Sequence, residues 1–278
     1  MKYKKLLIFI TSLIFVTTLV FSSVFFFKIA EIDLTVNSVI GSNENLDGVL
    51  SSRLEKYNGK NILFVSVNDV KKEMENASGY VKVNSVKKVF PNKLAVDVEE
   101  RVEVFAIKRQ NEYYILDENF NTLVKKQENV NNVNGLPNIL LDISLSDYDE
   151  ETLVSSKTLS LYDEKTTDTF NEIKEILLLR RENIASIKVN VRSDGMLNRY
   201  LLFNMTEGME IQIDRSNVLS KDKLVKMFEY YDSSENKGDT TKRYVTLLET
   251  GEIVVVWIFV YWHIIQYIVY YKGKLNFY

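Results

Sequence analysis

The stretch Gly59–Arg101 constrains the fold of this chain most, because the spacing of its apolar residues changes part-way along it. In its first half they recur at steps of three and four, as on one face of a helix: Val67, Val70, Met74 and Ala77. From Leu94 onward they alternate with polar residues, as in a half-buried strand. Pro91-Asn92 separates that strand from Val81–Phe90, and a proline without an amide to donate fits the turn of a hairpin. The stretch therefore predicts helix, strand, turn and strand.

The residue types around Ser66 predict where the helix begins. Ser66 and Asp69 have the spacing of a capping box, in which a hydroxyl and a carboxylate satisfy two free amides of the first turn. Upstream, Ile32–Ile40 alternates apolar and polar residues like a strand, and Leu46–Tyr57 has apolar residues at helical spacing. The order strand, helix, helix, strand, strand predicts a small two-layer α+β domain over residues 29–101.

The order and spacing of these segments resemble the POTRA domain of the FtsQ/DivIB family of bacterial division proteins. Gly59–Phe64 is similar to the short segment that precedes the second helix of that domain, and Val81–Arg101, with its Pro91-Asn92, to the run that closes it. The resemblance implies an α+β chain with an N-terminal transmembrane helix, a β-α-α-β-β POTRA domain and then a β-rich domain with flanking helices.

The N-terminal residues independently predict a membrane anchor. Three lysines within residues 1–5 precede Leu6–Phe27, a run of about 22 uncharged and mainly apolar residues, enough to cross a hydrocarbon core of ~30 Å. A cleaved signal peptide has a shorter apolar core and a small-residue cleavage site, which Phe25–Lys28 does not offer. We therefore expect an uncleaved single-pass type II helix at residues 6–27, with the lysines cytoplasmic and the bulk extracytoplasmic.

Residues 102–255 predict the β-rich domain. Strand-like runs and helix starts alternate along it: Tyr113–Leu116, a helix from a second capping box at Thr169 and Glu172, Ala185–Val191, Tyr200–Phe203, Met209–Ile213, a helix from Ser220, and Arg243–Leu248. Asp142–Thr167 predicts a loop with a short helix. Phe120 occupies the position at which the family usually has glycine in a turn, so this part matches the family more loosely.

The segment 256–278 is an atypical apolar tail for this family. Ile253–Tyr271 is nearly unbroken in its apolar and aromatic residues, and three accounts remain open. It is a second membrane span, a strand with an appended apolar tail, or the product of a frameshift near Val255. The residues alone do not decide among them.

Composition excludes several kinds of site. The chain has no cysteine and one histidine, His263, which lies in the tail, so the predicted ectodomain has no Ser-His-Asp arrangement and no zinc cluster. Glu99 and Glu100 are neighbours on a predicted strand and face opposite surfaces, so they do not converge on a substrate. We predict no catalytic residue, cofactor or metal. With 35 basic and 38 acidic residues, nucleic acid is not an expected partner.

The resemblance implies a non-enzymatic scaffold at the division septum. It would bind FtsL-like and FtsB/DivIC-like single-pass proteins and link them to the septal peptidoglycan synthase complex. The alternative is a membrane-anchored cell-wall enzyme or receptor with an unrecognised site. We expect partners to add a strand to an exposed sheet edge. The family's partner edge corresponds here to Arg243, Tyr244, Val245, Thr246, Leu247 and Leu248.

Overall fold

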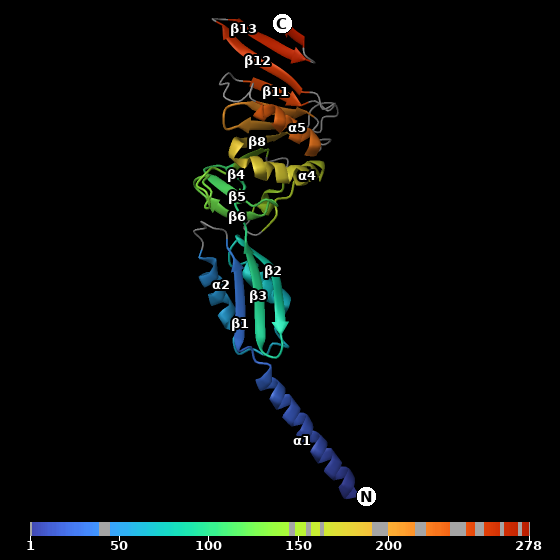
Figure 1. The fold of residues 1–278 in the computed structure, drawn as a ribbon. Coiled ribbons are helices and arrows are strands. Elements are labelled where there is room, and N and C mark those ends of the chain that lie inside the picture. Colours follow the sequence, from blue (N-terminus) through green and yellow to red (C-terminus); the bar gives the residue numbers. More distant parts are fainter. Residues whose placement is uncertain are drawn as a thin grey trace. The chain divides into compact units, whose positions relative to one another are not determined.

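A computed structural model describes residues 2–38, 45–144, 148–153, 157–161, 164–190, 200–214, 221–233, 243–247, 253–261, 264–271 and 274–277. Contacts within the chain divide it into two compact units, Met1–Arg101 and Val102–Tyr278. Each unit combines helices with a sheet (Figure 1), so the predicted α+β class is confirmed.

Helix α1 (Lys2–Phe26) occupies the N-terminal apolar run. Many of its large apolar side chains are exposed, among them Leu7, Phe15 and Phe25. In the part of the chain that the structure describes, no helix meets the length and hydropathy needed to cross a bilayer. The transmembrane helix expected at residues 6–27 therefore stays a prediction.

The first unit contains a three-stranded sheet in the order β1-β3-β2, with helices between β1 and β2 in the chain. Its elements are β1 (Glu31–Asn37), α2 (Leu46–Leu54), the 3₁₀ turn η1 (Glu55–Tyr57), α3 (Val67–Glu75), β2 (Val81–Val89) and β3 (Lys93–Glu100). Strand β1 runs parallel to β3, with Leu34 opposite Val96, and β2 runs antiparallel to β3. The predicted element order is confirmed, and Val70, Met74 and Val98 lie in the core.

Helices α2 and α3 each begin with a side-chain cap. The Ser66 hydroxyl accepts a hydrogen bond from the amide of Asp69 at 3.3 Å, as the capping box predicts for the serine. The Asn45 side chain accepts one from the amide of Gly48 at 3.2 Å. These bonds satisfy amides that have no partner within the first turn of a helix.

The second unit is built on an eleven-stranded sheet in the order β14-β13-β12-β11-β10-β9-β8-β7-β4-β5-β6. The strands are β4 (Phe105–Arg109), β5 (Glu112–Leu116), β6 (Thr122–Lys126), β7 (Ile139–Ile143), β8 (Ile184–Asn190), β9 (Tyr200–Met205), β10 (Glu210–Asp214), β11 (Arg243–Leu247), β12 (Ile253–Tyr261), β13 (Ile264–Tyr271) and β14 (Lys274–Phe277). Helices α4 (Glu164–Arg180) and α5 (Lys221–Asp232) contribute to one core with strands β4 and β7–β10. Short 3₁₀ turns are η3 (Glu150–Thr152) and η4 (Arg181–Asn183).

Two expectations for this unit need correction or completion. Helix α4 starts at Glu164, so Thr169 is a buried residue inside the helix, and the capping box predicted there is wrong. The residues just before Thr169 are polar, but none of them is a glycine or proline that would break a helix. The helix therefore extends towards the N-terminus beyond its apolar stripe. In the apolar tail, Ile253–Tyr261 and Ile264–Tyr271 form two antiparallel strands, β12 and β13, rather than a helix.

The surroundings of Phe120 explain how this chain tolerates a residue other than the usual glycine at that position. Its φ is +61°, in the region that glycine adopts at little cost. Asp117 holds the turn, because its Oδ1 accepts hydrogen bonds from the amides of Asn119 and Asn121, both at 2.8 Å. The ring is buried, stacked on Phe105 at 4.9 Å and edge-to-face with Phe170 at 5.4 Å. Burial of an aromatic ring offsets a backbone cost of roughly 1–2 kcal/mol.

Replacing Ser66 by alanine should lower the free energy of unfolding of the first unit by about 1 kcal/mol, because it leaves the Asp69 amide without its cap. Ser52→Ala is the control, because Ser52 is exposed within α2, where alanine is the better helix former. Denaturant unfolding measures both. Equal midpoints for the two variants would contradict the capping role.

Phe120→Ala should cost about 3–5 kcal/mol through the loss of the buried ring. Phe120→Gly should be no less stable than Phe120→Ala, because glycine relieves the positive φ while it loses only a methyl group more. At an ordinary strand or helix position glycine is the worse of the two. A glycine variant that unfolds at clearly lower denaturant than the alanine variant would show that the backbone carries no strain there.

Candidate partner-binding site

The strand predicted to bind a partner lies inside the large sheet. Residues 243–247 form β11, and Leu248 lies outside the described residues. Strand β10 pairs with β11 in parallel, with Ile211 opposite Val245, and β12 pairs on the other side, with Val255 opposite Val245. Both backbone edges of β11 are therefore paired, so the expected free edge is not present at Arg243–Leu247, and partner binding by Arg243–Leu248 stays a prediction. The β-branched and aromatic residues of the tail favour a strand, and that strand covers the edge.

Among the described strands, the free edges lie elsewhere. The small sheet ends in β1 and β2, and the large sheet in β14 and β6. An edge strand carries amides and carbonyls that no neighbouring strand satisfies, so it can accept a further strand. Of these edges, β1 also has a groove beside it.

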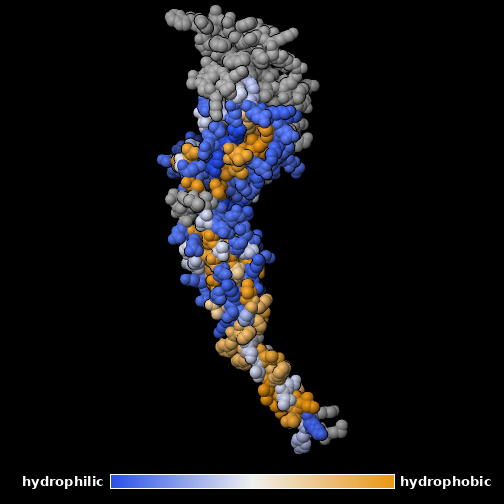
Figure 2. All heavy atoms as spheres, in the orientation of Figure 1, coloured by the Kyte–Doolittle hydropathy of each residue, from blue (hydrophilic) through white to orange (hydrophobic). Residues whose placement is uncertain are grey.

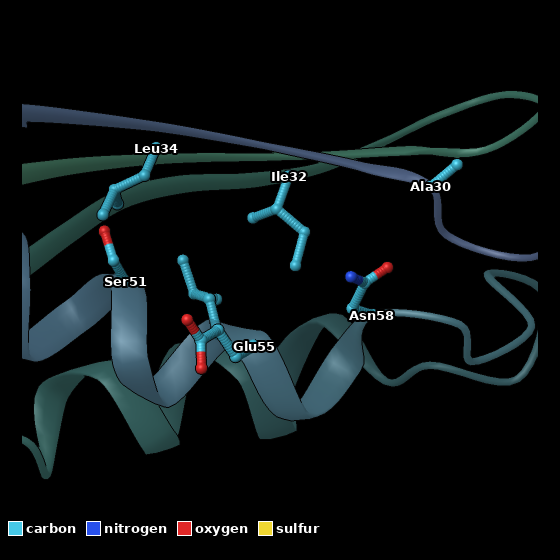
Figure 3. A pocket seen from close by; sticks show the side chains of 7 residues that line it. Ala30, Ile32, Leu34, Ser51, Glu55 and Asn58 are labelled. Carbon is cyan, nitrogen blue, oxygen red and sulfur yellow. The ribbon is translucent and has the colours of Figure 1, made fainter.

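This groove lies between β1 and the end of α2 (Figure 3), and its volume is about 240 Å³. The strand side provides Ala30, Ile32 and Leu34, which share one face because side chains two residues apart on an extended chain point the same way. The helical side provides residues at helical spacing: Ser51, Leu54, Glu55 and Asn58. In Figure 3 the side chains of Ile32 and Leu34 point from the strand toward the helix.

The charged residues of β1 point away from this groove. Glu31 and Asp33 alternate with Ile32 and Leu34, and both bind the ammonium of Lys93, at 2.9 and 3.0 Å. Hydrogen bonds to the two carboxylates raise the pKa of Lys93. The groove therefore presents an apolar floor with the carboxylate of Glu55 at its helical side. An extended segment could pair its backbone with β1 and place alternate side chains over this floor.

A buried carboxylate organises the start of the second unit. Both oxygens of Glu103 accept hydrogen bonds from the Lys126 ammonium, at 2.7 and 2.9 Å, and Oε2 accepts one from the side-chain Nδ2 of Asn138 at 3.3 Å. Its backbone carbonyl accepts from Asn131 at 2.7 Å and from Arg181 at 3.0 Å. Burial lowers the pKa of Arg181, while the charge of Glu103 opposes that shift. The cluster ties residues 127–138 to the sheet.

The remaining carboxylates do not assemble a site. Glu99 is half-buried, with the Lys82 ammonium 3.2 Å from its Oε2, whereas Glu100 is buried, so the two face opposite ways as predicted. Over the described residues, no three histidine, cysteine, aspartate or glutamate side chains gather where they would hold a metal ion.

Comparison with known proteins bears on the first unit above all. Residues 38–101 match the family described as "POTRA domain, FtsQ-type". These residues are similar to that domain, and we call residues 29–101 the POTRA domain after this match. The chain is also 29% identical over 108 residues to the cell division protein DivIB of Clostridium tetani, and 29% over 109 residues to that of Clostridium acetobutylicum. Each alignment covers 39% of this chain, and 38% and 41% of the respective relatives, so the chain spans about two fifths of their length. The predicted resemblance to the FtsQ/DivIB family is confirmed.

Sequence reasoning missed both the groove of the POTRA domain and the Glu103 cluster. The groove depends on how far α2 stands from β1, which periodicity does not specify. Glu103 lies between apolar residues at the start of the second unit, and its partners are 23 to 78 residues away in the chain. The sequence does contain one weak local signal for this cluster. Glu103 is a lone acidic residue inside an apolar run, and such a residue predicts a buried and paired carboxylate.

Lys126→Met should destabilise the second unit by about 3–5 kcal/mol, because it removes the ammonium that binds both oxygens of the buried Glu103 carboxylate. Lys125→Met is the matched control. Lys125 pairs with Glu112 at 2.7 Å, but both side chains are largely exposed, so the loss should stay below about 1 kcal/mol. Denaturant unfolding separates the two variants. A similar small loss in both would mean that Glu103 is not held by this ion pair.

Proposed function

We propose that this chain is a non-enzymatic scaffold of the bacterial division septum. The observation that carries the proposal is the FtsQ-type POTRA domain at residues 38–101, together with similarity to two proteins named as cell division proteins. Its partners are FtsL-like and FtsB/DivIC-like single-pass proteins, which it links to the septal peptidoglycan synthase complex.

The proposal includes a membrane anchor at α1. The uncharged run Leu6–Phe27 supports it, as do the exposed apolar side chains along the helix, such as Leu13, Phe15 and Leu19. The N-terminal lysines favour a cytoplasmic N-terminus and place the POTRA domain outside, where it meets the extracytoplasmic parts of other division proteins.

The means of binding is addition of a partner strand. The β1 edge of the POTRA domain supports this, because its free backbone groups lie next to an apolar groove that can select alternate side chains. The carboxylate of Glu55 beside the groove favours a partner segment that carries a lysine or arginine among small apolar residues.

Ser51→Trp tests the groove. Ser51 is exposed and lines the groove, so an indole there should block the incoming strand and weaken recovery of a DivIC-like partner about tenfold or more. Ser52→Trp is the matched control, because Ser52 is also exposed on α2 but is not among the residues that line the groove. Recovery that both variants leave intact would remove the groove from the proposal. Incubation of the protein with muropeptide tests the alternative function as an enzyme. Cleavage of the muropeptide would favour that alternative.

Arg243–Leu248 remains our second proposed partner strand, on the condition that β12 leaves it. Removing residues 253–278 should expose the β11 edge that faces β12 and increase partner recovery if this edge binds. The denaturant midpoint of the second unit, to which β11 belongs, serves as the control for folding of the shortened chain. Unchanged recovery from a folded, shortened protein would leave Arg243–Leu248 without a binding role.

A further inference from the structure

One end of the POTRA domain carries a surface that the proposed partner binding does not use. We call it the basal surface, and it consists of four exposed apolar residues with three lysines: Leu63, Phe64, Val89, Phe90, Lys28, Lys60 and Lys88. The side chain of Phe64 is 86% exposed and that of Phe90 57%. Large apolar side chains grouped in this way on a surface mark a binding site for something apolar.

Backbone hydrogen bonds bring the segments of the basal surface together. The amide of Ile62 donates to Phe27 at 2.8 Å, and that of Ile29 to Lys60 at 2.8 Å. The amide of Ala30 donates to Asn92 at 2.9 Å, which brings in the β2–β3 turn. All three bonds are made by the residues that directly follow α1, so the basal surface adjoins the end of that helix.

The conformation of the loop keeps the Phe64 side chain exposed. Its neighbours Ile62 and Val65 are buried, so the chain is anchored on both sides of Leu63 and Phe64. Asn61 holds the tip, because its side chain accepts a hydrogen bond from the Leu63 amide at 2.9 Å and its carbonyl one from the Phe64 amide at 3.1 Å. The Phe64 ring is therefore turned outward by a hydrogen-bonded turn.

The chemistry around these rings fits a lipid headgroup layer. Figure 2 shows hydrophobic residues that cover α1 and continue on to the adjoining end of the first unit. The rings of Phe27 and Phe90 are 6.2 Å apart and nearly perpendicular, which joins the surface to the helix end. The Lys28 ammonium lies 4.9 Å from the Phe25 ring centre, and the Lys88 ammonium donates to the Leu63 carbonyl at 3.2 Å. Aromatic rings with flanking lysines are typical of a membrane interface.

We propose that the basal surface rests in the headgroup region of the bilayer that holds α1. Phe64 and Phe90 insert into the interface, and Lys28, Lys60 and Lys88 face the phosphates of anionic lipids. This inference rests on the proposed anchor, and it adds a second membrane contact that limits rotation of the POTRA domain about its tether. It thereby sets the height at which the β1 groove meets a partner.

The absence of cysteine makes a single-site label possible in the full chain. A spin label at Phe64→Cys, in vesicles of phosphatidylcholine and phosphatidylglycerol, is compared with one at Lys72→Cys on the exposed side of α3. Collisions with oxygen, which partitions into lipid, are measured against collisions with a water-soluble nickel chelate. We expect the label at residue 64 to favour oxygen several-fold over the label at residue 72.

A third label, at Phe15→Cys in α1, separates the two proposals. If it contacts lipid while residue 64 behaves like residue 72, the basal surface does not touch the bilayer and only this inference fails. If residue 15 also contacts water, the anchor itself fails. A label at residue 64 that is shielded from both reagents would show a protein partner on the surface and would likewise overturn the inference.

The lysines are tested by lipid charge. Lys60→Glu should reduce the oxygen preference of the residue 64 label in vesicles that contain phosphatidylglycerol, and should change little in phosphatidylcholine alone. Lys72→Glu makes the same charge change away from the surface and should leave the label unaffected in both. Equal effects of the two substitutions would overturn the role assigned to the lysines.

Discussion

The parallel pairing of β1 with β3 is the constraint on which the POTRA domain depends. Parallel strands cannot be joined by a tight turn, so the chain needs a long crossover between them, and here α2, α3 and β2 supply it. The crossover places both helices against one face of the sheet. Strand β3 enters last and takes the centre, with Leu94, Val96 and Val98 buried, which leaves β1 at the edge. The groove beside β1 is thus a consequence of the order in which strands join the sheet.

The same pairing also creates the basal surface. Because β1 and β3 run in the same direction, their first residues lie at the same end of the sheet, with Glu31 opposite Lys93. The β2–β3 turn and the segment after α1 therefore meet at one end, where Phe27 contacts Phe90. Such a meeting of chain start and hairpin turn holds the exposed rings next to the proposed anchor. Had β1 been antiparallel to β3, the turn would lie at the opposite end from α1.

Periodicity predicted the elements of the POTRA domain because its helices and strands each have one side that faces solvent and one side that faces the core. The alternation of β3 and the helical stripe through Val70 and Met74 record that difference directly in the sequence. The helix start at Ser66 was predictable too, since a cap depends on residues three apart. The groove, by contrast, depends on the distance between two packed elements, and no local pattern records that distance.

In the second unit the sequence failed where the answer depended on distant residues. Glu103 obtains its cation from Lys126 and a further donor from Arg181, neither of which its own neighbourhood reveals. The spacing of Thr169 and Glu172 predicted a helix start at Thr169. The residues before Thr169 contain no glycine or proline that would break a helix, and the helix begins earlier, at Glu164. Phe120 shows a different limit of prediction from sequence. Its positive φ could be predicted only by comparison with the glycine that the family usually has at this position.

The position of β11 depends on what its neighbours do with their own unpaired edges. A strand is an edge only if nothing later in the chain pairs with it, and Ile253–Tyr261 has the composition that pairs most readily. Once β12 is added, its own outer edge needs a partner, and β13 and then β14 supply one in turn. An apolar tail rich in strand-forming residues therefore moves the free edge outward. A partner that binds β11 must compete with a strand of the same chain, whereas one that binds β1 meets backbone groups that no described strand occupies.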